Sequence, residues 1–139
     1  MMKRAVISLV TLFVTISFIS AQYKQEIKVL PLLETDTTAL GQKIHYPEGG
    51  KEQVTMCKVI IPPGKSTGWH KHEIPVFAFV EKGTLSVELE GGKVNNFPEN
   101  STFAEVVGTY HNGTNKGDSD VVLIAIYLGL KNRPLSIKK

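Results

Sequence analysis

The stretch VFAFVEKGTLSVELEGGKVNNF, residues 76–97, decides the fold class. Short runs rich in valine, leucine and phenylalanine are separated by two turn signals, Lys82-Gly83 and Gly91-Gly92. Between these turns, residues 85–90 alternate apolar and polar side chains, which predicts a strand with one buried and one solvent-facing side. A glycine pair between two such runs is typical of a tight β-hairpin. The stretch therefore predicts antiparallel strands.

The same pattern continues on both sides of this stretch, and no run reads as a long amphipathic helix. Turn-forming residues separate the runs at close spacing, which is typical of a β-sandwich or barrel. The strands that we predict are Ile27–Leu33, Gln42–Tyr46, Val54–Ile61, Val76–Glu81, Leu85–Glu90, Val94–Phe97, Thr102–Val107 and Val121–Leu128. Because the chain has 139 residues and shows neither an internal repeat nor a linker, we expect one all-β domain.

The beginning of the chain reads as an export signal rather than as part of this domain. Lys3 and Arg4 precede an apolar run over residues 5–19, which ends in small residues typical of a cleavage site. The run is short for a bilayer core of ~30 Å, although an uncleaved anchor stays open as an alternative. We predict a signal peptide at residues 1–21 and a periplasmic or secreted domain at residues 22–139, with no stable membrane anchor after cleavage.

Charge and cysteine content restrict the partners and the source of stability. The formal net charge is +3, two of these charges lie in the leader, and no cluster of Lys and Arg follows, so we expect no nucleic-acid partner. Cys57 is the one cysteine of the sequence, so the domain has no internal disulfide and depends on its core. We expect Cys57 to be a small buried apolar side chain.

Two histidines follow a glycine turn in a run that we expect to be extended. Gly64 is followed by five residues and then by His70-Lys71-His72. Alternate residues of a strand face the same way, so His70 and His72 would point together into the barrel while Lys71 points out. Two neutral imidazoles in a confined space are typical ligands of a transition metal.

A third histidine comes much later, at His111. A barrel can bring such a late residue against the first pair. The three histidines therefore predict a site for one divalent metal ion at His70, His72 and His111. The identity of the ion stays open among iron, manganese, zinc and nickel, because imidazole binds several metals well.

These residues resemble the two motifs of the cupin superfamily. Its first motif is similar to Gly64-x5-His70-x-His72 with Gly83 at the close, and its second to Asn100-x5-Val106-x-Gly108-x2-His111-x3-Asn115. The resemblance implies a small single-domain protein with a double-stranded antiparallel β-barrel of the cupin or jelly-roll type. It also implies a metal held by inward-facing side chains and assembly as a homodimer.

Two departures from the family pattern matter. Val76 stands where the family usually has a glutamate ligand, four residues after His72. Asn100 and Val106 stand where glycine and proline are usual, which affects turns more than chemistry. Three neutral ligands would leave the ion its full +2 charge and an open face, so we expect an anionic or chelating small molecule to bind there.

Other side chains are expected around the pocket. Glu105 lies among apolar neighbours, and we place it near the metal but outside its ligands; ligation and a solvent-facing position stay open as alternatives. Ala78 and Val80 share the strand side of Val76 and are expected to line the cavity with it. His45 is expected on a strand surface, with a place at the pocket rim as the alternative.

Several neighbours of these residues are expected to face away from the metal. Glu73 has the opposite strand side from His72 and is expected at the surface. Trp69 and Tyr110, each just before a histidine, are expected outside the barrel or at an oligomer interface. Phe77 and Phe79 share one strand face, where core packing and the same interface are both open.

Three function classes follow from these observations. The first is a metal-dependent dioxygenase that acts on a small anionic or chelating compound, because the three-histidine set resembles that of some cupin dioxygenases. The second is a non-catalytic cupin that binds a metal or a small molecule. The third is a structural barrel with histidines that bind nothing, which the order and spacing of both motifs disfavour. The sequence leaves the first two open, and it names neither catalytic residues nor the substrate.

Overall fold

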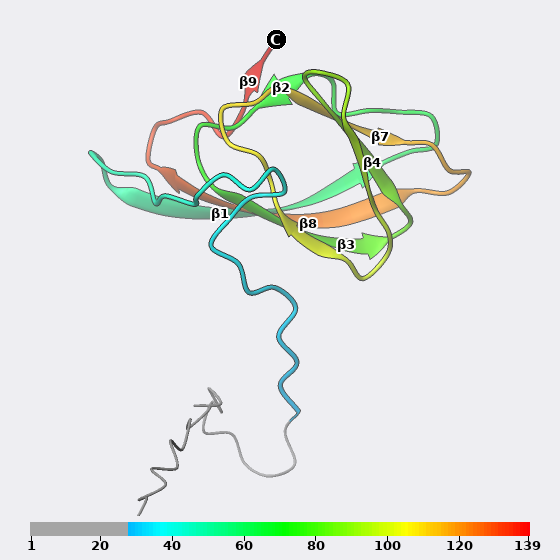
Figure 1. Ribbon diagram of the computed structural model, residues 1–139, viewed down its shortest axis with the longest axis horizontal. Coiled ribbons are helices and arrows are strands. Elements are labelled where there is room, and N and C mark those ends of the chain that lie inside the picture. Colours follow the sequence, from blue (N-terminus) through cyan, green and yellow to red (C-terminus); the bar gives the residue numbers. More distant parts are fainter. Residues whose placement is uncertain (1–27) are drawn as a thin grey trace, which may run out of the picture. The chain divides into compact units, whose positions relative to one another are not determined.

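The computed structural model describes residues 28–139, and residues 31–139 form one compact unit (Figure 1). The predicted signal peptide lies outside the described residues. Within residues 28–139 the structure contains no helix that is long and apolar enough to cross a membrane. The strands are β1 (Glu52–Ile61), β2 (His70–Lys71), β3 (Val76–Lys82), β4 (Leu85–Leu89), β5 (Val94–Phe97), β6 (Thr102–Ala104), β7 (His111–Asn115), β8 (Val121–Leu130) and β9 (Ile137–Lys138).

The strands form two antiparallel sheets, as the predicted all-β jelly-roll fold requires. One sheet has the order β1-β8-β3-β6 and the other the order β5-β4-β7-β2-β9. β4 and β5 form the hairpin predicted at Gly91-Gly92, and both glycines adopt a positive φ. Sequence neighbours such as β7 and β8 lie in different sheets, so side chains from both sheets meet in the interior.

Most of the predicted strands are present, with two corrections. Residues 28–33 contain no strand, and the side chains of Leu32 and Leu33 are exposed. In Gln42–Tyr46 the pairing is limited to an isolated bridge between Thr37 and Lys43. Both runs have apolar residues but no adjacent strand to pair with, and tertiary pairing decides whether such a run forms a strand.

β7 is the reverse case, because the sequence did not predict it. Its residues, HNGTN, include glycine and asparagine, which are rare in strands. It forms because β4 pairs along its whole length, from Leu85 opposite Asn115 to Leu89 opposite His111. Pairing with a neighbouring strand therefore outweighs the low β-propensity of these residues.

The core lies between the sheets. It joins side chains of β1, β3, β6 and β8 in one sheet with side chains of β4 in the other and with Val106, which lies outside the strands: Ile61, Ala78, Val80, Leu85, Val87, Leu89, Phe103, Val106, Val121 and Leu123. The rings of Phe97 and Phe103 stack on it, with centroids 3.6 Å apart. Cys57 is only partly buried, not fully as expected. At Asn100, where the family usually has glycine, φ is +65°, a conformation that asparagine tolerates.

Candidate metal centre

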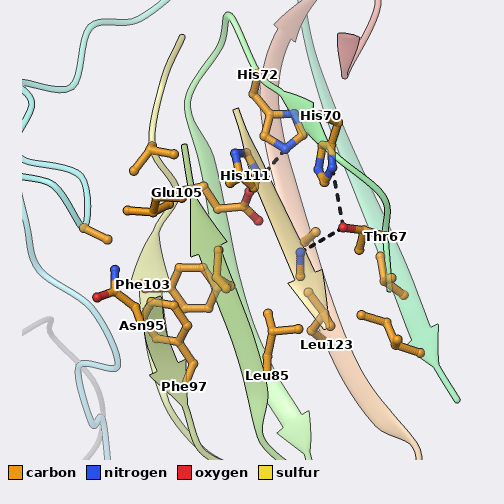
Figure 2. A pocket seen from close by; sticks show the side chains of 18 of the residues that line it. Thr67, His70, His72, Leu85, Asn95, Phe97, Phe103, Glu105, His111 and Leu123 are labelled. Atoms are coloured by element: carbon orange, nitrogen blue, oxygen red, sulfur yellow. Dashed lines mark hydrogen bonds and ion pairs between the residues drawn. The ribbon is translucent and has the colours of Figure 1, made fainter. Parts of the chain in front are cut away.

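The structure brings His70, His72 and His111 together at one end of the interior (Figure 2). β2 and β7 pair with His70 directly opposite His111, and His72 follows β2 and forms a bridge to Val107. Their ring centroids are 4.5–5.1 Å apart, and one ring nitrogen from each lies within 4.8 Å of the others. His72 and His111 are buried, and His70 is partly buried.

The neighbours of the histidines face away from the cluster, as strand alternation predicts. The ammonium group of Lys71 pairs with the exposed Glu73 at 2.5 Å and lies 5.5 Å from the ring centroid of Tyr110. The ammonium of Lys139 lies over the rings of both Trp69 and Tyr110. These aromatic side chains therefore form a cation–π cluster outside the histidine site rather than a part of it.

A backbone carbonyl fixes the orientation of each imidazole. The Nδ1 atom of His70 lies 2.8 Å from the carbonyl oxygen of Gly68, that of His72 lies 2.7 Å from Leu135, and that of His111 lies 3.0 Å from Thr109. A carbonyl oxygen only accepts hydrogen bonds, so each Nδ1 must carry a proton and donate it. In the neutral form every Nε2 then presents a lone pair, as a metal ligand must.

Glu105 reaches the cluster from the opposite sheet. It follows β6, and its Oε2 atom lies 3.1 Å from Nε2 of His111 and 3.2 Å from Nε2 of His72. Its side chain is 14% exposed. Among the open alternatives for this residue, the solvent-facing position is therefore wrong. Gly108, with φ of +69°, turns the chain between Glu105 and His111.

The charges of these groups are coupled. Burial alone would raise the pKa of the Glu105 carboxyl, but hydrogen bonds from His111 and His72 and their charges lower that pKa to about 2. Burial alone would lower the pKa of His111, but the hydrogen bond and charge of Glu105 raise it. Burial lowers the pKa of His70, and burial together with the charge of Glu105 raises the pKa of Tyr127 to about 12.

The site therefore concentrates electron-pair donors at one point. A carboxylate is only an acceptor, and a neutral imidazole with its proton on Nδ1 is an acceptor at Nε2. Acceptors at 3.1–3.2 Å repel each other unless a cation lies between them. Protons on the imidazoles can supply that charge, and so can a metal ion. The donor set of imidazole nitrogens and a carboxylate oxygen suits a divalent transition metal.

A cavity of about 60 Å³ extends from the histidines into the interior. Glu105, Thr67 and the three histidines line one end of it (Figure 2). Apolar residues of both sheets line the rest: Val59, Ile61, Leu85, Val87, Leu89, Phe97, Phe103, Val106, Leu123 and Ala125.

Three residues expected at the cavity lie elsewhere, and so does His45, for which the pocket rim was the alternative. Val76, Ala78 and Val80 are buried, but they pack in the core and do not line the cavity. Leu123 and Ala125 on the adjacent strand β8 provide that wall instead, which strand alternation within β3 alone does not predict. His45 is exposed, lies outside a strand and does not line the cavity.

Three contributors were missed in the sequence. The carbonyl of Leu135, 63 residues from His72, accepts the hydrogen bond of its ring. Strand β9 pairs with β2, with Lys138 opposite His70. Thr67 accepts a hydrogen bond from the backbone N–H of Gly113 at 3.0 Å, which ties the loop before β2 to β7. No sequence signal indicates these contacts, because they depend on long-range register.

Comparisons with known proteins agree with this architecture. The sequence matches the family model of the cupin domain over residues 57–127, just over half of the chain. A comparison with curated proteins finds no sequence match.

Solved structures with the same fold include enzymes. The DMSP lyase DddQ from Ruegeria pomeroyi matches with a TM-score of 0.53 at 15% identity, over 62% of this chain and 43% of the lyase. An oxalate oxidase in complex with the substrate analogue glycolate matches with a TM-score of 0.51 at 23% identity, over 60% of this chain and 45% of the oxidase. A protein from Bacillus halodurans matches with a TM-score of 0.52 at 21% identity, over 60% of this chain and 67% of that one.

The chain thus spans less than half of the lyase and of the oxidase. At these identities the likeness shows the fold and leaves the reaction of this chain undefined.

Proposed function

Because the chain belongs to the cupin domain family, we propose that it binds one divalent metal ion through its three clustered histidines and Glu105 and takes a small anionic ligand at that ion. The observation that carries the proposal is the convergence of acceptors. The imidazole Nδ1 atoms donate hydrogen bonds to backbone carbonyls. The Nε2 lone pairs and the Glu105 carboxylate therefore converge on one point in a largely buried site.

The distances also fit a shared ion. Ligand atoms at about 2.1 Å from one metal lie roughly 3.0–3.4 Å apart in octahedral or tetrahedral arrangements. The Oε2 atom of Glu105 lies 3.1 Å and 3.2 Å from the two Nε2 atoms, within this range. From the sequence we expected Glu105 outside the ligands. Its spacing from two of the histidines supports the proposed inclusion, while the ligand atoms that all lie within 4.8 Å of one another are those of the three histidines.

The residues have distinct roles in this proposal. The three histidines and Glu105 hold the ion, and the carbonyls of Gly68, Thr109 and Leu135 orient the imidazoles. When bound, the ion would act as a Lewis acid that polarises an oxygen-containing group of the ligand. The apolar wall beside the ligand set would exclude water from that group.

A non-haem iron dioxygenase is the second candidate. Four protein ligands leave two positions on a six-coordinate ion, which is enough for O₂ and a substrate bound through one atom. A chelating substrate together with O₂ would need three positions. The inclusion of Glu105 thus narrows the substrate of such an enzyme to one with a single metal-binding atom. Oxygen uptake by the iron-loaded protein, screened over small carboxylates, tests this candidate.

We also propose that the chain is exported, on the strength of its first 21 residues, and that the domain forms a homodimer. On the outer face of β1, the side chains of Val54, Met56 and Ile60 are 57–67% exposed. The same face carries the ion pair of Lys58 and Glu81. A second copy related by a twofold axis would match apolar surface to apolar surface and place lysine near glutamate.

Metal analysis of the purified domain tests the main proposal. We expect about one ion per chain in the wild type and loss of that ion in His70→Ala and in His111→Ala. His45→Ala is the matched control, because His45 is exposed and outside the cavity, and it should keep the ion. Stoichiometric metal in the His70→Ala/His111→Ala double variant would contradict the proposal.

A further inference from the structure

The cavity behind the histidines is polar at one end and apolar at the other. Around the metal centre it is lined by imidazoles, the Glu105 carboxylate and the Thr67 hydroxyl. Away from it, the side chains of Leu85, Phe97 and Phe103 line the cavity, as Figure 2 shows. A molecule in the cavity would contact electron-pair donors at one end and hydrocarbon at the other. The arrangement favours a molecule with one polar end.

The polar groups at the metal centre have few free hydrogen-bonding positions left for a second polar group of the ligand. Each Nδ1 atom is bonded to a carbonyl, and the hydroxyl of Thr67 donates to Gly68 and accepts from Gly113. Beyond the centre, the polar side chains that line the cavity are Asn95 and Tyr127. Neither of them carries a charge that would balance an anion.

The net charge of the metal centre limits the charge of the ligand that can bind there. A divalent ion held by three neutral imidazoles and one carboxylate ligand leaves a net charge of +1 at the centre. One singly charged anion neutralises this charge. A dianion would leave an unpaired negative charge against the apolar wall, and no lysine or arginine lines the cavity as the structure describes it.

We propose that this centre selects a small monoanion with an apolar body, whose charged group binds the metal ion while its hydrocarbon part lies along Leu85, Val87 and Leu123. The inference rests on the proposed metal site. It goes further by excluding small dianions and chelating dicarboxylates as preferred ligands, because the cavity offers no cation for a second carboxylate.

The test uses protein loaded with Co²⁺, whose visible spectrum reports anions that bind the metal. Acetate, butyrate and hexanoate form one series, and malonate and succinate form the other. We expect affinity to rise roughly threefold per added methylene in the monoanion series, since each CH₂ is buried in the apolar part. The dicarboxylates should bind at least tenfold more weakly than the monocarboxylate of the same chain length.

Two variants of buried valines test whether the hydrocarbon part of the ligand lies along this cavity wall. Val87→Leu adds one methylene to the cavity wall and should lower hexanoate affinity at least fivefold while acetate affinity stays the same. Val80→Leu is the matched control, because Val80 is also buried but does not line the cavity, and it should change neither affinity.

The outcomes separate the two proposals. A protein that takes up no Co²⁺ refutes the metal site and the ligand class together. A protein that binds Co²⁺ but prefers malonate or succinate, or binds acetate and hexanoate equally, keeps the metal site and overturns the ligand class.

Discussion

The backbone N–H of Glu105, just after β6, donates a hydrogen bond to the carbonyl of Val76 at the start of β3 at 2.8 Å, so the two residues are neighbours. The register of β3 and β6 continues to this pair, since Phe77 lies opposite Ala104. Residues directly opposite each other in an antiparallel pair project on the same side of the sheet. We therefore propose that Glu105 supplies the carboxylate that the family pattern places at position 76.

This relationship predicts that the carboxylate can be moved between the two strands. We expect Glu105→Val to lose metal affinity at least 100-fold, because a charged ligand is removed from the centre. The double variant Val76→Glu/Glu105→Val should recover affinity to within about tenfold of the wild type. Val76→Glu alone should weaken anion binding, since a second carboxylate fills a position and neutralises the site. Calorimetric titration of chelator-treated protein with metal measures these affinities.

Glu73→Val is the control for these variants, because Glu73 adjoins His72 but is exposed. Its metal affinity should equal that of the wild type. From the sequence alone we expected Glu105→Ala to keep its metal. If the Glu105 variants stay folded by circular dichroism and keep full affinity, that earlier expectation is right and Glu105 is not a ligand.

The pKa of His111 predicts that metal binding releases a proton. In the metal-free protein Glu105 raises the pKa of His111 above its ordinary 6.5, although burial opposes the shift. At pH values below 6.5 this imidazole therefore holds a proton that a metal ion must displace. Metal affinity should fall as the pH is lowered through this range, and calorimetry in buffers of different ionisation enthalpy should count the released proton.

Glu105→Gln removes the charge that raises this pKa. In that variant the proton release at pH values below 6.5 should decrease markedly. Equal proton release in the wild type and the variant would show that Glu105 does not control the charge of His111.

The C-terminal segment is predicted to position the ligands. The Leu135 carbonyl binds His72, β9 pairs with β2, and Lys139 contacts Glu90 and Trp69. Removal of residues 136–139 should lower metal affinity roughly tenfold to 100-fold, the usual cost of losing a partner that orients a ligand. Lys138→Ala keeps the backbone pairing and should have little effect. Wild-type affinity in the truncated protein would show that β9 does not support the site.

The outer face of β1 predicts the oligomeric state. Met56→Lys should shift the protein from dimer to monomer in sedimentation velocity, because it places a charge in the middle of the proposed contact. Val94→Lys changes an exposed apolar residue on the other sheet and should leave the dimer intact. A monomeric wild type at high protein concentration would refute this interface.

Local patterns predicted much of the fold. Residues 76–97 contain three strands and a hairpin, and the structure has all of them, because alternation and glycine turns act over a few residues. The local sequence pattern gave wrong predictions where pairing with a neighbouring strand decides whether a strand forms. Gln42–Tyr46 has suitable residues but no strand partner, and His111–Asn115 has unsuitable residues but a partner along its full length.

The sequence by itself determined the all-β class, the cupin resemblance and the three histidines that the structure brings together. These follow from residue types and from spacings within one or two strands. Only the tertiary structure decided that Glu105 meets His72 and His111 and that the Leu135 carbonyl orients His72. It also decided that β8 rather than β3 lines the cavity. Each of these depends on the register between segments far apart in the chain, and register is set by the packing of whole sheets.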